Sequence, residues 1–238
     1  MDVKDKVIIV TGASEGIGEA SARLLAGRGA AVALVARSTD RIERLAGELR
    51  GAFPYTADMS HLDAVRAMIV AVHAHFGRID VLINYACRGL HGTPVERIAV
   101  EQFRGLIELN VMGPLVAMQE VIPLMRRQGG GVIVNISSQL SRLHVPGLSA
   151  YAATKYMLNA LTLTARDELA ADNIRVCLVL PARTATRFQF NSLHRPGDPR
   201  QVQPSGDPAE LVAQRILEAI ESEAAEVLVR GEPGTTRG

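Results

Sequence analysis

A tyrosine and a lysine stand four positions apart in the sequence YAATK, residues 151–155. Positions i and i+4 of a helix share one face, so the side chains of Tyr151 and Lys155 can meet. A free tyrosine has a pKa of about 10, too high for efficient proton exchange near neutral pH. An ammonium group about 4 Å away would favour the phenolate by up to ~4 kcal/mol at an effective dielectric constant near 20. The pair therefore predicts a general acid/base. The simpler interpretation is a tyrosine packed on a lysine stem at a helix surface.

A glycine-rich segment follows the first apolar run of the chain. The sequence TGASEGIG, residues 11–18, comes directly after VIIV and before a helical pattern. Gly12, Gly16 and Gly18 permit a tight turn whose backbone amides approach an anion, and the helix N-terminus adds partial positive charge. This placement predicts a cradle for the phosphates of a dinucleotide, with a plain strand-to-helix turn as the alternative.

The end of the second apolar run predicts which dinucleotide is bound. An acidic residue there would hold the 2′-hydroxyl of NAD, whereas an arginine suits the 2′-phosphate of NADP. The sequence VALVARS has Ala36 where the acid would stand, with Arg37 beside it. This favours NADP(H). Glu15 of the glycine loop argues for NAD(H), because it could repel the phosphate or neutralise Arg37.

Short β-branched runs alternate with helical patterns and predict the elements that position these residues. Such apolar runs fit parallel strands covered on both faces. We expect one domain over residues 1–238, an α/β Rossmann-like doubly wound parallel sheet of about seven strands with helices on both faces. The expected strands are 7–10, 31–36, 53–57, 80–84, 131–136, 175–180 and 226–229.

Capping residues and one long irregular stretch complete this outline. Ser60 and Asp63 form a capping-box pattern, and Gly51 and Gly77 are expected to close helices. Residues 187–206 contain three prolines and follow a strand end, where such sheets bind ligands. We expect this stretch to be a substrate lid.

Composition excludes several classes of function. The 26 Lys and Arg residues balance 25 Asp and Glu, so neither nucleic acid nor an anionic membrane is an expected partner. We expect no membrane span, two reduced cysteines (Cys87 and Cys177) and a soluble cytoplasmic protein. No metal site is expected, since His73 and His75 point apart on a helix.

With TGxxxGxG, YxxxK and this length, the chain resembles the short-chain dehydrogenase/reductase family from about residue 5 to 187. The resemblance implies a catalytic tetrad of Asn110 in IELNVMG, Ser138 in VIVNISS, Tyr151 and Lys155. It implies that Ser138 binds the substrate oxygen and Lys155 the nicotinamide ribose. Asn110 would position a water that relays protons to Lys155. Singly, each residue also fits an ordinary structural position.

The resemblance further implies a set of cofactor contacts along the chain. Asp58 and Met59 would contact adenine, although Asp58 also fits a strand-end cap. Thr184 and Thr186 would contact the carboxamide. The full expected set is Gly12, Ser14, Glu15, Gly16, Ile17, Gly18, Arg37, Asp58, Met59, Asn84, Ala86, Tyr151, Lys155, Pro181, Thr184 and Thr186.

Three positions depart from the family pattern. The usual Asn-Asn-Ala-Gly is Asn84, Tyr85, Ala86 and Cys87 here, and the usual Pro-Gly is Pro181-Ala182. Cys87 could crowd the ribose side, and Ala182 would be strained if its position needs a positive φ.

The expected activity is an oxidoreductase that interconverts a carbonyl and an alcohol by hydride transfer, with NADP(H) favoured over NAD(H). Leu140, Val145 and Leu148 indicate an apolar small-molecule substrate. The alternative is a non-catalytic dinucleotide-binding sensor or scaffold. The family also implies a homodimer or homotetramer, built on long helices such as the one from Tyr151 to about Asp172.

Overall fold

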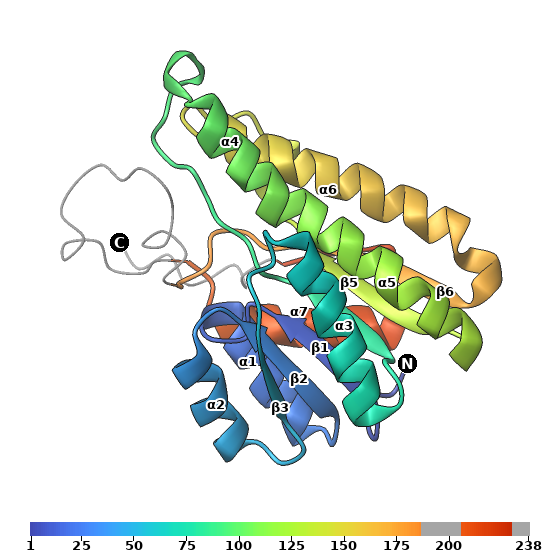
Figure 1. Cartoon of the computed structure of the whole chain (residues 1–238). Coiled ribbons are helices and arrows are strands. Elements are labelled where there is room, and N and C mark those ends of the chain that lie inside the picture. Colours follow the sequence, from blue (N-terminus) through green and yellow to red (C-terminus); the bar gives the residue numbers. More distant parts are fainter. Residues whose placement is uncertain (187–205, 230–238) are drawn as a thin grey trace.

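The computed structural model describes residues 1–186 and 206–229, which form a seven-stranded parallel sheet covered by helices on both faces (Figure 1). The strand order is β3-β2-β1-β4-β5-β6-β7, and every neighbouring pair is parallel. The expected α/β doubly wound fold is thereby confirmed. The strands are β1 (Val7–Thr11), β2 (Ala31–Ala36), β3 (Phe53–Thr56), β4 (Val81–Asn84), β5 (Gly131–Ile136), β6 (Ile174–Leu180) and β7 (Glu226–Leu228).

The helices lie between the strands in chain order. The α-helices are α1 (Gly16–Gly27), α2 (Thr39–Glu48), α3 (Leu62–Phe76), α4 (Val100–Ile107), α5 (Gly113–Gln128), α6 (Ser149–Glu168) and α7 (Ala209–Ser222). The short 3-10 helices are η1 (Val95–Arg97), η3 (Gln139–Arg142) and η4 (Ala170–Asp172), and η2 (Glu108–Met112) is a π-helical turn. The expected lid 187–206 lies outside the described residues, apart from Gly206.

Two hydrophobic cores fill the space between sheet and helices. Side chains alternate across a strand, so Ile8 and Val10 of β1 enter one core while Val7 and Ile9 enter the other. Helices α1, α2 and α7 close the first core, and α3 and α5 close the second. Burial on both faces explains why these strands are apolar along their whole length.

Two expected helix ends differ in the structure. Helix α3 has His61 as its N-cap, without a side-chain cap, because the Ser60 hydroxyl donates to Asp58 Oδ1 at 2.7 Å. The predicted capping box is therefore wrong. Helix α2 ends before Gly51, at Glu48, with an extended residue after it. Gly77 does close α3, in the left-handed conformation at φ 75°.

Helices α4, η2 and α5 run on as one helical stretch, Val100–Gln128, of 29 residues. This stretch is the one candidate among the described residues that length and apolar composition would allow to cross a membrane. Half of its most apolar window is buried inside the protein. Val116, Val121 and Met125 of α5 belong to the second core, so packing against the sheet accounts for the apolar composition.

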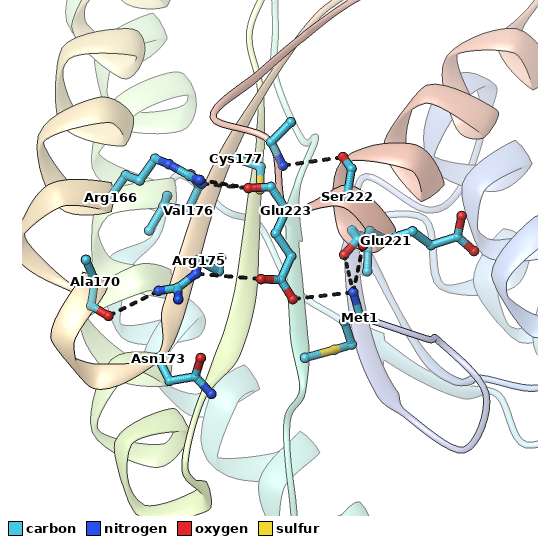
Figure 2. Close-up of polar contacts among 12 residues, drawn as sticks. Met1, Arg166, Ala170, Asn173, Arg175, Val176, Cys177, Glu221, Ser222 and Glu223 are labelled. Atoms are coloured by element: carbon cyan, nitrogen blue, oxygen red, sulfur yellow. Dashed lines mark hydrogen bonds and ion pairs between the residues drawn. The ribbon is translucent and has the colours of Figure 1, made fainter.

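The C-terminal end of α7 is tied to β6 and α6 by a polar cluster (Figure 2). The Glu223 carboxylate lies between the Met1 ammonium, at 3.4 Å, and the Arg175 guanidinium, at 3.6 Å. Arg166 of α6 donates to the backbone carbonyls of Glu223 (2.8 Å) and Val176 (2.9 Å). These contacts fix α7 against the sheet edge opposite β3.

The sheet order reverses direction at β1, whose two neighbours are β2 and β4. Parallel strands place their carboxyl ends on one edge, and ligands of such sheets bind at this reversal. The residues that follow β1, β2, β4, β5 and β6 therefore define the candidate site.

Candidate active site

The turn between β1 and α1 is built from glycines that admit no side chain. Gly12 and Gly16 have φ values of 73° and 61°, in the left-handed region that favours glycine. A Cβ on Gly18 would lie 2.2 Å from the Gly12 carbonyl oxygen, so helix and turn pack backbone to backbone. Glu15 is the N-cap of α1 but makes no side-chain cap. This cradle fits the pyrophosphate of a dinucleotide, and Ser14, Glu15 and Ile17 lie within it.

Two arginines after β2 form ion pairs with the acids of the neighbouring turns. The sequence led us to expect that Glu15 could neutralise Arg37. Arg41 Nη1 lies 2.7 Å from Glu15 Oε2, so Arg41 balances this carboxylate. Arg37 lies 3.8 Å from Asp58 Oδ2 and keeps 59% of its side chain exposed. The idea that Glu15 would neutralise Arg37 is therefore wrong.

Asp58 and Met59 follow β3 and have distinct surroundings. The Asp58 carboxylate accepts hydrogen bonds from the Ser60 amide at 2.9 Å and its hydroxyl at 2.7 Å. Burial raises the pKa of Asp58, but these bonds and the Arg37 charge outweigh it and leave the pKa below its ordinary value. Met59 is buried in the second core. Asp58 thus organises the turn after β3.

Ser138, Tyr151 and Lys155 meet at the carboxyl end of β5. Ser138 is the second residue after the strand, and its side chain is hydrogen-bonded to Tyr151. Lys155 Nζ lies 5.7 Å from the centroid of the Tyr151 ring and donates to the Ile136 carbonyl at 2.8 Å. Tyr151 is 5% exposed and Lys155 only 2%, so both sit in a site largely closed to water. This explains the four-residue spacing: α6 presents both groups to the end of β5.

The direction of the Tyr151 pKa differs from the sequence prediction. Burial raises the pKa of Tyr151 well above its ordinary value, nearby Cys87 and Tyr85 add to this, and the Ser138 hydrogen bond opposes it. Burial also lowers the pKa of Lys155. Loss of hydration disfavours every charged form, an effect that the spacing alone does not reveal. Tyr151 is therefore held as the neutral phenol at neutral pH.

Asn110 lies in the π-helical turn η2 and is 1% exposed. Its side chain accepts from the Arg88 amide and donates to the Arg88 carbonyl, both at 2.9 Å. It also donates to the Thr154 hydroxyl at 3.1 Å, beside Lys155 on α6. Asn110 thus joins the segment after β4 to α6, and its side chain contacts the neighbour of Lys155.

The segments after β4 and β6 close the cradle. Asn84 Nδ2 donates to Asn135 Oδ1 at 2.8 Å, which links β4 to β5, and Ala86 Cα would lie 3.1 Å from a Cβ on Gly12. The Pro181 carbonyl accepts from the Gln139 amide at 2.9 Å. Thr186 is buried, with its methyl carbon 3.2 Å from where a Gly16 Cβ would stand.

Ala182 carries no backbone strain. Among the described non-glycine residues, positive φ values occur at Asp5, Asn173 and Glu223. The alanine in place of the family's glycine is therefore tolerated. Thr184, two positions on, donates to the Ala182 carbonyl at 3.3 Å and pairs with Asp207.

Four further residues, to which the sequence assigned no cofactor or substrate contact, lie at the candidate site. Thr11 Oγ1 accepts the amides of Tyr85 (3.0 Å) and Ala86 (3.1 Å), which joins β1 to the segment after β4. The His91 ring lies 6.0 Å from the Tyr151 ring. Arg41 is paired with Glu15, and Tyr85 lies under the glycine turn. Arg41 and Tyr85 each had a signal in the sequence: Arg41 stands four positions after Arg37, and Tyr85 replaces the family's second asparagine.

Fold and site together define a dinucleotide-binding α/β protein with a buried Ser-Tyr-Lys group beside a phosphate cradle. The model of the family described as short chain dehydrogenase matches residues 6–196. The chain therefore belongs to the short-chain dehydrogenase/reductase family, a family of oxidoreductases.

Relatives with known names or structures agree with this assignment. The chain is 35% identical over 196 residues to a 3alpha-hydroxysteroid dehydrogenase of Mediterraneibacter gnavus, covering 78% of this chain and 76% of the relative. A metagenomic short-chain oxidoreductase in complex with NADP is 32% identical, with a TM-score of 0.79 and coverage of 96% and 98%. A 3-ketoacyl-(acyl-carrier-protein) reductase from Brucella melitensis, complexed with NADH, is 28% identical, with a TM-score of 0.86 and coverage of 97% and 98%. Both kinds of nicotinamide dinucleotide thus occur among structural neighbours.

Proposed function

We propose that the protein is an NADP(H)-dependent oxidoreductase that interconverts a carbonyl group and an alcohol, with Tyr151 as general acid/base. The observation that carries this proposal is the Tyr151 phenol, buried, hydrogen-bonded to Ser138 and one turn from Lys155 at the end of β5. A buried group able to give up a proton, beside a dinucleotide cradle, matches what carbonyl reduction requires.

Each residue has a chemical role in this proposal. The bound nicotinamide supplies or accepts the hydride. Ser138 hydrogen-bonds the substrate oxygen, and Tyr151, held neutral, donates its proton to that oxygen in the reductive direction. Lys155 uses one of its three donors on the Ile136 carbonyl, which leaves others for the ribose hydroxyls and for stabilising a Tyr151 phenolate. Asn110 holds α6 in register, and the proton-relay water implied by the family stays a prediction.

NADP(H) is the proposed cofactor because of the charges at the end of β2. Arg37 presents a guanidinium that is 59% exposed and only loosely paired, at 3.8 Å, with Asp58. Glu15, the residue that would oppose a 2′-phosphate, is balanced by Arg41 at 2.7 Å. An exposed arginine fork suits a phosphate better than a ribose hydroxyl.

The proposed substrate is a small apolar ketone or alcohol. Leu140 and Leu148 flank the segment between Ser138 and Tyr151, and the His91 ring stands beside the Tyr151 ring. Val145 lines a groove with Pro146, Ala153 and Tyr156, and its contact with the substrate stays a prediction. The name of the Mediterraneibacter relative, a hydroxysteroid dehydrogenase, supports an apolar alcohol. A soluble cytoplasmic location stays a prediction.

Replacing Tyr151 by phenylalanine tests the proposal. The purified protein is screened with NADPH against a panel of apolar ketones, with turnover followed by loss of NADPH absorbance. We expect Tyr151→Phe to lower kcat by about 10²-fold or more, because the proton donor is lost. Affinity for NADPH, measured by fluorescence titration, should stay within about threefold. Tyr156→Phe, on the exposed face of the same helix, is the control and should keep full turnover.

Two results would contradict the proposed function. Unchanged turnover in Tyr151→Phe would refute the role of the phenol. Dinucleotide binding by the unsubstituted protein with no turnover on any ketone or alcohol in the panel would favour the non-catalytic sensor or scaffold.

A further inference from the structure

Tyr85 stands where the family has the second asparagine of Asn-Asn-Ala-Gly, and its ring lies against the glycine turn. A Cβ on Gly12 would come within 2.9 Å of Tyr85 Cδ1, and a Cβ on Gly18 within 3.0 Å. A Cβ on Gly16 would be 3.4 Å from the Tyr85 hydroxyl oxygen. The aromatic ring therefore packs against Gly12 and Gly18, and its hydroxyl reaches Gly16 at the N-terminus of α1.

The backbone of Tyr85 is fixed in this position. Its amide donates to Thr11 Oγ1 at 3.0 Å, and the Thr11 hydroxyl donates in turn to the Ile83 carbonyl at 3.2 Å. On the far side of the turn, Thr186 packs against Gly16. The phenol is therefore held between β1, β4 and the glycine turn, and does not sit on a free loop.

The Ile17 backbone amide lies beside the Tyr85 hydroxyl and acts to lower the pKa of the phenol. This amide belongs to the first turn of α1, whose unpaired N–H groups normally bind an anion directly. Burial raises the pKa of Tyr85 above its ordinary value, and the nearby Cys87 and Glu15 raise it further. The group is therefore a neutral phenol that accepts with its oxygen and has its own proton to donate.

We propose that Tyr85 is a positioning residue for the cofactor, which connects the N-terminus of α1 to the dinucleotide pyrophosphate. The Ile17 amide donates to the phenol oxygen, and the phenol donates to a phosphate oxygen. This inference rests on the dinucleotide binding of the proposed function. It assigns a role to a residue that departs from the family pattern. The asparagine usual at this position is shorter than tyrosine and carries no hydroxyl that could reach past the three glycines.

A competing explanation is that the ring of Tyr85 only fills space beneath the turn. Phenylalanine distinguishes the two, because Tyr85→Phe keeps the ring against Gly12 and Gly18 and removes the hydroxyl alone. Tyr85→Met serves as a second variant that keeps apolar bulk. Tyr156→Phe, the same substitution on the exposed face of α6, is the matched control.

The experiment measures binding and not turnover. The whole chain and its variants are titrated with NADPH by nicotinamide fluorescence and with NADP⁺ by calorimetry. We expect Tyr85→Phe and Tyr85→Met each to weaken both ligands about tenfold, the size expected for one hydrogen bond to a charged group. Binding of 2′-AMP, which lacks the pyrophosphate, should be unchanged in both variants, and unfolding temperatures without ligand should match within experimental error.

The outcomes separate this inference from the proposed function. If the unsubstituted protein binds NADPH and Tyr85→Phe binds it equally or more tightly, Tyr85 is a filler or an obstacle and the inference is wrong while the proposed function stands. If 2′-AMP is weakened as much as NADPH, the substitution has disturbed the whole turn and the specific role is refuted. If the unsubstituted protein binds no dinucleotide, both fail.

Discussion

Two arginines at the ribose end of the site, four positions apart, take different partners. Arg41 binds Glu15 at 2.7 Å, and Arg37 faces Asp58 at 3.8 Å with most of its side chain exposed. Glu15 therefore has an arginine partner other than Arg37. In the proposed function, these two ion pairs at the residue scale set the choice between the two nicotinamide dinucleotides.

This arrangement predicts different roles for the two arginines: Arg37 binds the 2′-phosphate, and Arg41 balances the charge of Glu15. Arg37→Ala should weaken NADPH binding by about tenfold or more and leave NADH within about twofold, because only NADPH has the 2′-phosphate. Arg41→Ala should weaken NADPH binding less, because it leaves the Glu15 carboxylate without this partner and free to repel the 2′-phosphate. The double variant Arg41→Ala/Glu15→Gln should restore the affinity, because it removes that carboxylate charge. Parallel fluorescence titrations with both dinucleotides measure the effects. Equal losses for NADPH and NADH in Arg37→Ala would refute the assignment.

At the scale of elements, the start of β4 is bound to the start of β1 by one carboxylate. Asp80, which is 3% exposed, accepts from the Val7 amide at 2.9 Å and from Arg78 at 2.6 and 2.9 Å. These two strands form the reversal point of the sheet and carry Gly12 and Asn84 at their far ends. The geometry of the cradle at the carboxyl ends of β1 and β4 therefore depends on the contact between Val7 and Asp80 at their amino ends.

Removing this carboxylate should destabilise the whole fold. We expect Asp80→Ala to lower the free energy of unfolding by about 2–4 kcal/mol, because a buried amide and a guanidinium lose their acceptor together. Urea denaturation followed by circular dichroism measures the change. Asp63→Ala is the control: Asp63 is fully exposed and pairs with Arg66 on the surface of α3, so no measurable change is expected. A loss as small as that of the control would show that Asp80 is dispensable.

At the scale of the whole molecule, several large apolar side chains are exposed together near the outer face of α6. Tyr156 of α6 is 42% exposed, and Leu143 and Val145 of the preceding segment are 51% and 40% exposed. These three side chains line one groove. Exposed apolar patches of this kind mark interaction surfaces, and the long helix α6 is the element on which the family resemblance implies a homodimer or homotetramer.

A charge on this face should therefore separate the subunits. We predict that the protein is a dimer in solution and that the double variant Leu143→Glu/Tyr156→Glu is a folded monomer. Light scattering after gel filtration gives the masses. Val70→Glu, which places a charge on an equally exposed apolar position of α3, at 65%, is the control and should stay dimeric. An unsubstituted monomer, or a double variant with unchanged mass, would contradict the prediction.

Local patterns in the sequence determined the architecture and the chemical groups. The seven strands fall within about one residue of the ranges expected from apolar runs, since burial of the inner strands on both faces demands continuous apolar residues. Gly12, Gly16 and Gly18 predicted a cradle because only glycine meets its backbone geometry. The spacing of Tyr151 and Lys155 predicted one helix face, and the structure places Ser138 beside it.

Only the tertiary structure decided which groups pair and which are charged. Glu15 and Arg41, Tyr85 and Ile17, and Ser60 and Asp58 are partners whose distance depends on how strands and turns pack, which no local pattern encodes. The pKa of Tyr151 is shifted in the direction opposite to the prediction from its spacing with Lys155, because burial removes water from both groups and disfavours both charged forms. Hydration and pairing are properties of the assembled site, and the sequence specifies them only through the fold.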